Sequence, residues 1–244
     1  MTTKHTQSVT IQDLFDAGSH FGHPSRRWNP KMTKFIFTKR NGSHIIDLSK
    51  TIEKLDDAIS FMEDTISRGG KCLFVGTKKH AQTIIRLNAE RSDSYYINQR
   101  WLGGLMTNFK TIEKRLDRLV ELEESFAKGV VISQTKRESQ KLDAERGRLN
   151  KFFSGIKEMK ELPAVLFVVD IHREKIAVTE AKKLGIPVVG MVDTNSNPDE
   201  IDYPIPSNDD GLRSIQIITD IITDSIISGQ EISKKRQEDL MAEE

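Results

Sequence analysis

Short apolar runs alternate with amphipathic segments along most of the chain. The runs hold almost no polar residues between their apolar ones, which is typical of strands buried on both faces of a parallel sheet. The amphipathic segments carry apolar residues at three- and four-residue steps, which predicts helices. Strands are expected at 72–76, 95–98, 164–170 and 187–193, and helices at 77–91, 173–185 and 209–229. The alternation predicts an α/β fold, a three-layer parallel sheet of the Rossmann or flavodoxin-like type.

The N-terminal part has a different pattern. Thr10 opens a capping box at the start of a short helix, and Ser49 can cap a much longer one. Between them, FIFTKRNGSHII (35–46) is typical of two strands joined by Asn41-Gly42, a pair that suits a tight hairpin turn. The stretch SHFGHPSRRWNPKM (19–32) has no apolar period, so we expect a loop that is held by something outside itself.

Residues 107–160 interrupt the alternation, because they contain no strand pattern. Two helices with narrow apolar seams and charged outer faces are expected here, on either side of Gly129. Narrow seams favour an antiparallel coiled-coil hairpin inserted into the α/β domain. The alternative is that both helices lie flat on the sheet. The predicted organisation is one α/β domain from 1–106 and 161–229, the hairpin at 107–160, and an acidic tail at 230–244 that we expect to be disordered.

Charge is distributed unevenly, although the net charge is only +1. Six basic residues and no acid lie between Arg26 and Arg40, whereas residues 190–244 carry a net charge of −9. Such polarity predicts two faces with different partners, one of them a polyanion. Cys72 is the only cysteine, which excludes internal disulfides. We find no membrane span and no export signal near Met1, and therefore expect a cytoplasmic protein.

The usual catalytic and nucleotide-binding motifs are absent: the sequence has no GxGxxG after a strand, no GxxxxGK[ST] and no GxSxG. FVGTKKHA (74–81) places Lys78 and Lys79 where a strand turns into a helix, a position that favours an anion. His23 and the aspartates at strand ends could hold a divalent cation such as zinc or magnesium. Histidines that only pack or form hydrogen bonds are the alternative. The candidate metal ligands are His23, Asp193, Asp209 and Asp210.

Several blocks of the sequence together resemble the bacterial form of the small-subunit ribosomal protein two family. They cover almost the full length in order: AGSHFGHPSRRWNPKM, FVGTKKHA, NQRWLGGLMTNF, LPAVLFVVD, LGIPVVGMVDTNSNPD and IPSNDD. The resemblance implies a parallel α/β fold with a protruding helical hairpin. It also implies a non-enzymatic protein of a bacterial or plastid ribosome that needs no cofactor. Its expected partners are 16S rRNA, where the head of the subunit meets the body, and neighbouring ribosomal proteins, among them the large mRNA-binding first protein.

Arginine pairs and a neighbouring tryptophan are suited to RNA, because guanidinium groups bind phosphates and aromatic rings stack on bases. Burial in the core is the alternative for Trp28 and Trp101, and for Trp101 it is as good an interpretation as stacking. The predicted RNA-binding residues are Arg26, Arg27, Trp28, Asn29, Lys31, Lys34, Lys39, Arg40, Lys78, Lys79, Arg100 and Trp101.

A second class of function stays open at this point. An α/β enzyme, or a protein that binds a nucleotide or another anion, could use the crevice at the carboxyl ends of the strands. Such a site would need a concave pocket with converging titratable groups.

Overall fold

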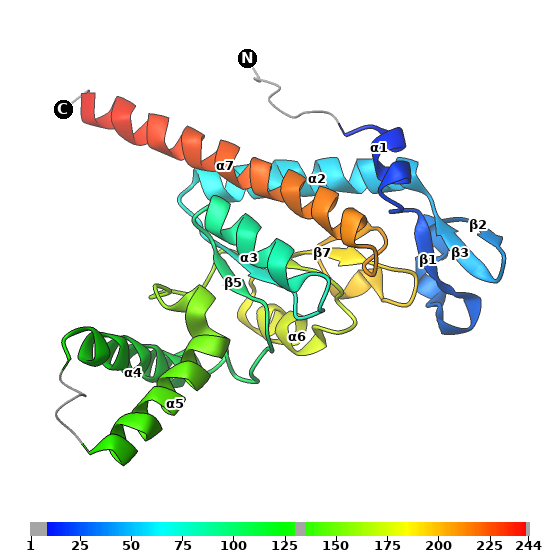
Figure 1. Ribbon diagram of the computed structural model, residues 1–244. Helices are drawn as coiled ribbons and strands as arrows, with labels where there is room; N and C mark the ends of the chain where they lie inside the picture. Colours follow the sequence, from blue (N-terminus) through cyan, green and yellow to red (C-terminus); the bar gives the residue numbers. More distant parts are fainter. Residues whose placement is uncertain (1–8, 130–134, 243–244) are drawn as a thin grey trace.

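The central sheet has five parallel strands in the order β5-β4-β6-β7-β8. The computed structural model describes residues 9–129 and 135–242 (Figure 1), so the predictions for 1–8 and 243–244 lie outside the described residues. The strands are β4 (Cys72–Val75), β5 (Tyr95–Ile97), β6 (Val165–Val168), β7 (Val188–Val192) and β8 (Tyr203–Pro206). Counted from β4, the order is the 2-1-3-4-5 of flavodoxin-like folds, with the switch point between β4 and β6. The predicted α/β class is confirmed.

Helices cover both faces of this sheet, as its uniformly apolar strands require. Phe74 and Phe167 meet edge-to-face on one side, beneath α2 (Leu48–Ser67), α3 (Gln82–Arg91) and α7 (Leu212–Ala242). On the other side, Leu73 and Leu166 pack against α6 (Lys175–Leu184) and residues from the segment 101–116. The helices leave the carboxyl ends of the strands uncovered, and the N-terminal segment around His23 packs there.

Two strands were not predicted. β8 has the sequence YPIP, and its prolines are tolerated because it is an edge strand that leaves one side without a ladder. β1 (Phe21–Pro24) lies inside the stretch that was expected to be only a loop. This expectation was wrong because pairing with β3 (Ser43–Ile46), and not an apolar period, makes the segment a strand.

The N-terminal antiparallel sheet has the order β1-β3-β2, where β2 spans Ile36–Arg40. Asn41 and Gly42 both have positive φ, 51° and 80°, as the predicted hairpin turn requires. The capping box at Thr10 opens α1 (Ile11–Asp16), as expected. The cap of α2 was misassigned, since Asp47 and not Ser49 accepts the hydrogen bond at that helix start.

Helices α4 (Phe109–Ala127) and α5 (Lys136–Phe153) stand away from the sheet at one end of the molecule (Figure 1). An ion pair between Arg118 and Glu145 (3.4 Å) and another between Glu123 and Lys157 (2.6 Å) connect α4 to α5 and to the segment just after it. The root is continuous with the core, because Ile112 of α4 belongs to the apolar cluster beneath the sheet. The coiled-coil packing of these helices stays a prediction.

The C-terminal segment corrects a prediction. Residues from 230 onward were expected to be a disordered tail, but α7 continues through Ala242 and projects beyond the body (Figure 1). The reason is composition: glutamate, lysine, glutamine and arginine are strong helix formers, and Glu231 precedes Lys235 by four residues. In the described part of the chain, no helix is both long and apolar enough to cross a membrane.

The carboxylate of Glu180 on α6 fixes the segment that leads into α4. Glu180 is only 5% exposed, and its two oxygens accept five hydrogen bonds from residues 101–107. The donors are the Trp101 indole (3.1 Å), the Gly104 (2.7 Å), Met106 (3.0 Å) and Thr107 (3.0 Å) amides, and the Thr107 hydroxyl (3.0 Å). Burial alone would raise the pKa of Glu180, but the donors outweigh it and lower that pKa. The WLGGLMT motif is therefore a cradle for a buried anion.

We predict that Glu180→Gln lowers the free energy of unfolding by about 3 kcal/mol, because an amide group turns a donor toward donors that have no other partner. The stabilisation from a lowered pKa is fully present above the ordinary glutamate pKa of about 4.3 and is lost as the pH falls through the lowered folded value. The difference in the free energy of unfolding between wild type and variant should therefore become smaller below about pH 4. Urea unfolding at several pH values measures both effects.

The matched control is Glu90→Gln on the exposed face of α3, which should change stability by less than about 0.5 kcal/mol. Equal stability of wild type and Glu180→Gln at pH 7 would contradict the cradle.

Candidate nucleic-acid interface

The loop that follows β1 is anchored to the turn after β7. Thr194 provides two acceptors: its hydroxyl accepts from the His23 amide (2.9 Å) and its carbonyl from the Asn29 amide (2.7 Å). The contact is tight, since a Cβ on Gly22 would lie 2.5 Å from the Thr194 methyl group. The turn after β7 is therefore the outside support that the loop was expected to need.

The turn after β8 holds the start of the same stretch. Asn208 donates through its backbone amide to the Ser19 carbonyl (3.0 Å) and through its side chain to the Gly18 carbonyl (3.0 Å). The sequence blocks VDTNSNPD and IPSNDD thus lie beside SHFGHPSRRW in space. They are distant in the sequence, since Thr194 follows His23 by 171 positions. Together these contacts fix the loop before any partner binds.

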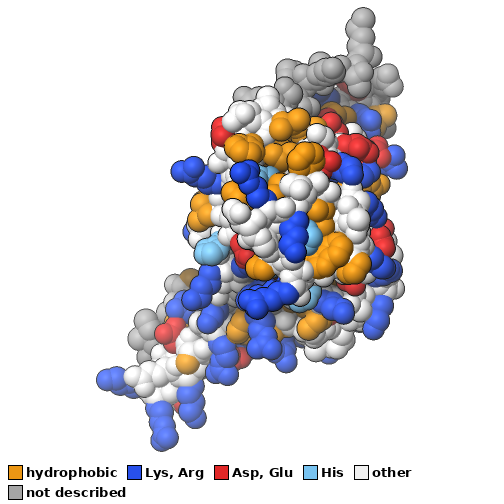
Figure 2. All heavy atoms as spheres, turned by 90° about the vertical axis from the view of Figure 1, so that its right-hand side faces the viewer, with side chains coloured by type: hydrophobic (Ala, Val, Ile, Leu, Met, Phe, Trp, Pro, Cys, Tyr) orange, Lys and Arg blue, Asp and Glu red, His pale blue; other side chains and the backbone are white. Residues whose placement is uncertain are grey.

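The basic side chains of this region are exposed. Arg26, Arg27, Lys39 and Arg40 all lie at the surface, the first two in a short 3₁₀ segment, Ser25–Arg27. Lys31 and Lys34 are also exposed, and their ammonium groups pair with Asp199 (3.0 and 3.2 Å). In Figure 2, lysine and arginine side chains gather over the lower half of this face and on the projecting helices, where few acidic ones are seen.

Trp28 is 36% exposed, and one side of its ring is supported from within the protein. The His44 ring lies 4.8 Å from the Trp28 ring, centroid to centroid, and is itself buried. Burial lowers the pKa of His44, and the nearby Lys39 charge lowers it further, so that this support is neutral at pH 7. Asn29 has a structural role, since its side chain accepts from the Lys31 amide and caps the next 3₁₀ helix, Pro30–Phe35.

Two predicted RNA-binding residues do not offer their side chains to a ligand at the surface. Trp101 is only 5% exposed, and its indole N–H binds Glu180, so the core interpretation is the correct one. Lys78 turns its ammonium group into a cluster of aspartates and is not free to meet a phosphate. Lys79 and Arg100 are exposed, as expected.

Lys78 lies at the carboxyl edge of the sheet among three carboxylates. Its ammonium is 3.1 Å from Asp170 after β6, 2.7 Å from Asp209 and 2.6 Å from Asp210. Burial opposes the charge of this ammonium, but the aspartates outweigh burial and raise the Lys78 pKa. One lysine thus contacts three carboxylates at the switch point and neutralises part of their negative charge.

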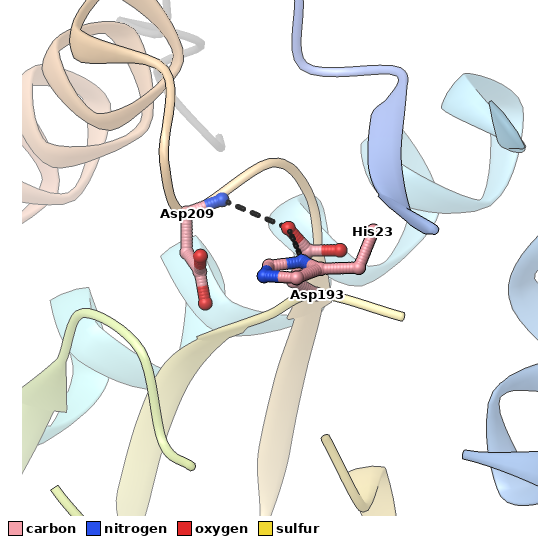
Figure 3. A group of neighbouring side chains, drawn as sticks. All are labelled: His23, Asp193 and Asp209. Carbon is pink, nitrogen blue, oxygen red and sulfur yellow. Dashed lines mark hydrogen bonds and ion pairs between the residues drawn. The ribbon is translucent and has the colours of Figure 1, made fainter. Parts of the chain in front are cut away.

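The predicted metal ligands are brought together in the same place. The imidazole of His23 lies between Asp193 (3.0 Å from Nδ1) and Asp210 (3.4 Å from Nε2), and Figure 3 shows its ring directed at Asp193 beside Asp209. The hydrogen bond to Asp193 raises the His23 pKa, against the effect of burial. One potential ligand atom from each of His23, Asp193 and Asp209 lies within 4.8 Å of the others.

Within the cluster, the surroundings of Asp209 disfavour its ionised form. It is fully buried, and burial, followed by the charges of Asp193 and Asp170, raises its pKa to about 7 in spite of Lys78. Among the residues that the structure describes, its Oδ2 atom has no hydrogen-bond partner. A buried carboxylate oxygen of this kind needs a proton, a water molecule or a cation as its partner.

Sequence reasoning missed residues that support the interface from behind. Two of them, Thr194 and Asn208, bind the backbone of the loop, and a third, His44, packs against the Trp28 ring. Contacts of this kind produce no residue spacing that can be recognised in the sequence. Asp170 adopts φ 66°, rare for a residue other than glycine, and is held there by Lys78 and by the Arg173 amide (2.9 Å). The aspartates that end two apolar runs, Asp170 and Asp193, were the signal that the sequence did provide for this edge of the sheet.

Comparison with known proteins gives a consistent result over nearly the whole chain. A family described as Ribosomal protein S2 matches residues 14–229. A relative from Dehalococcoides mccartyi strain 195, named small ribosomal subunit protein uS2, is 54% identical over 227 residues, which cover 93% of each chain. Relatives with the same name from strains BAV1 and CBDB1 of that organism are 53% identical over the same length.

Proposed function

This chain belongs to the ribosomal protein S2 family, and from that premise we propose that it binds rRNA through the anchored basic loop. Its role is that of a structural, non-enzymatic protein of the small ribosomal subunit in translation. The enzyme alternative is thereby excluded. The cluster of Lys78, His23 and the aspartates at the strand ends serves instead to hold the basic loop on the sheet edge.

The observation that carries the proposal is a rigid loop whose cations point outward. Each arginine can bind a phosphate through two parallel hydrogen bonds. Because Thr194 and Asn208 already fix the backbone, little conformational entropy remains to be lost on binding. With Lys78 and Trp101 left out, the proposed RNA surface comprises Arg26, Arg27, Trp28, Asn29, Lys31, Lys34, Lys39, Arg40, Lys79 and Arg100.

The resemblance supplies the finer placement. It implies 16S rRNA at the junction of head and body as the ligand, and the relatives from Dehalococcoides mccartyi favour a bacterial over a plastid source. Helix α7, with four basic and five acidic residues, has no excess of positive charge to attract rRNA.

A protein partner is also part of the proposal. Ile11, Phe15 and Phe21 expose 51%, 53% and 55% of their surface around α1 and β1, next to the ring of His20. Exposed apolar patches on ribosomal proteins suit protein contacts better than phosphate contacts. The large mRNA-binding first protein, implied by the resemblance, is the candidate for this surface.

The domain organisation belongs to the proposal as well. We take 1–106 and 161–229 as one α/β domain, and 107–160 as an inserted hairpin with coiled-coil packing. In support, Leu116, Leu119 and Leu122 of α4 are buried at three-residue steps, whereas most of the other α4 residues are exposed.

We predict that replacing Arg26, Arg27 and Arg40 by Gln weakens binding to small-subunit rRNA roughly tenfold or more. The slope of log affinity against log salt should flatten by about 0.7–0.9 for each lost phosphate contact. Filter binding at four salt concentrations measures both quantities. The control is the same charge change at Lys175, Lys182 and Lys183 on the exposed side of α6. Equal slopes for the two variants would refute the loop assignment.

The acidic cluster supports a second proposal, a divalent cation bound by His23, Asp193 and Asp209, with Asp210 at its edge. The unpartnered Asp209 Oδ2 supplies a ready acceptor, and a cation would keep Asp209 ionised. A nitrogen ligand beside carboxylates favours zinc over magnesium, which prefers oxygen ligands. Such an ion would strengthen the tie between the loop and the sheet edge.

We predict that the full-length protein binds zinc in calorimetry and that His23→Ala weakens this binding by tenfold or more. His172→Ala, at an exposed position outside the cluster, is the control and should leave binding unchanged. If wild type and His23→Ala take up zinc equally, the cluster is only a network of ion pairs around Lys78.

A further inference from the structure

A chain of hydrogen bonds joins the turns that follow the neighbouring strands β4 and β6. The Thr77 hydroxyl donates to a carboxylate oxygen of Glu174 (2.5 Å), and the Thr77 amide donates to the same oxygen (3.1 Å). The Nε–H group of Arg173 in turn donates to the Thr77 hydroxyl oxygen (3.0 Å). Thr77 and Glu174 are both buried. The guanidinium group of Arg173 is therefore tied, through Thr77, to a buried carboxylate.

The outer part of the Arg173 guanidinium group is free to meet a ligand. The side chain is 54% exposed, and its contact with Glu174 is a long one, 4.0 Å from Nε. Among residues 9–129 and 135–242, the terminal nitrogens Nη1 and Nη2 have no hydrogen-bond acceptor. The backbone is held as well, because the Arg173 amide donates to Asp170 Oδ1 (2.9 Å). Two unpaired donors are thus presented to solvent in a defined position.

The surface formed by these two turns is basic. The exposed titratable side chains of residues 77–81 and 171–176 are Lys79, His80, His172, Arg173 and Lys175. The acid within these two segments, Glu174, is buried. Asp210, whose carbonyl lies 3.1 Å from the His80 ring, has its carboxylate paired with Lys78 (2.6 Å). An anion that approaches Arg173 therefore meets basic side chains, and the nearby aspartate is already neutralised in part.

We propose that Arg173 binds a backbone phosphate of rRNA through its two terminal nitrogens, with Thr77 as the positioning residue. The inference rests on the proposed function and extends the RNA surface from Lys79 to the start of α6. The class of ligand follows from the donors, since the parallel N–H groups of a guanidinium match two oxygens of a phosphate. A side chain already held at Nε also has less conformational freedom to lose on binding.

Sequence reasoning could not single out this arginine. In REKIAVTEAKKLG (173–185) it is one of several charged residues of an amphipathic helix, with no spacing that distinguishes it. What orients its side chain is Thr77, 96 positions away in the sequence.

The first test uses the full chain and small-subunit rRNA in filter binding at several salt concentrations. Arg173→Gln should weaken binding about fivefold. The slope of log affinity against log salt should flatten by about 0.7–0.9, because one phosphate contact is lost. Arg86→Gln, at an exposed position of α3, is the matched control and should keep the wild-type affinity and slope. Wild-type affinity of Arg173→Gln would overturn the inference and leave this arginine only a fastener between two turns.

A double-mutant cycle tests the positioning role of Thr77. Thr77→Val removes the hydroxyl group at nearly constant volume and should weaken rRNA binding about threefold, whereas Thr77→Ser should keep the wild-type affinity. In the Arg173→Gln background, Thr77→Val should cause no further loss, because it acts only through the arginine. Additive losses would contradict the positioning role. Arg173→Gln alters only an exposed side chain, so the inference stays testable even if Thr77→Val does not fold.

A free nucleotide offers the same phosphate chemistry, and calorimetry with GMP and with inorganic phosphate distinguishes the two sources. Neither should bind measurably to the wild-type chain. Binding of GMP that Arg173→Gln abolishes, together with unchanged rRNA affinity, would overturn the inference in favour of a mononucleotide site.

Failure of this inference differs from failure of the proposed function. If the loop variant loses affinity for rRNA while Arg173→Gln does not, the inference is wrong and the loop interface stands. If the wild-type chain does not bind small-subunit rRNA at all, the proposed function itself fails.

Discussion

The ammonium group of Lys78 is the contact on which the rest of the binding face depends. Four aspartates meet at the carboxyl edge of this sheet, and their mutual repulsion in a buried setting would oppose folding. Lys78 contacts three of them, and Asp193 and Asp210 in turn hold His23. The loop, the last helix and two strand ends are thereby tied to one point. Breaking a buried pair of this kind typically costs about 3–5 kcal/mol.

Glu180 has the opposite charge and a similar task on the other side of the sheet. Its carboxylate gathers the indole and amide donors of residues 101–107 just before the chain enters α4. The direction in which the hairpin leaves the body is thus set by a buried anion, and that of the loop by a buried cation. In this view, the proposed RNA contact at the loop rests on an element positioned before rRNA arrives, which lowers the entropy lost on assembly.

Much of the fold followed from periodicity, and the parts that did not have physical reasons. The buried strands and the capped helices were predictable because apolar spacing and local caps determine them. Strand β8 was not predicted because its two prolines are unusual in a strand. The helical end of α7 was not predicted because its charged composition is also typical of a disordered tail. In the site, exposed Arg26 and Arg27 were predictable from charge alone. Lys78 and Trp101 were not, since whether a lysine or tryptophan faces water or a buried partner depends on residues about 80 to 130 positions away.

Hydrogen exchange of the free protein tests the central claim most directly, that the loop is fixed before it meets RNA. The His23 and Asn29 amides, both bonded to Thr194, should be protected in the wild type without RNA. In Lys78→Met their protection should fall, while amides of α4 and α5 keep theirs. Free exchange of these two amides in the wild type, with protection only after rRNA is added, would contradict the account.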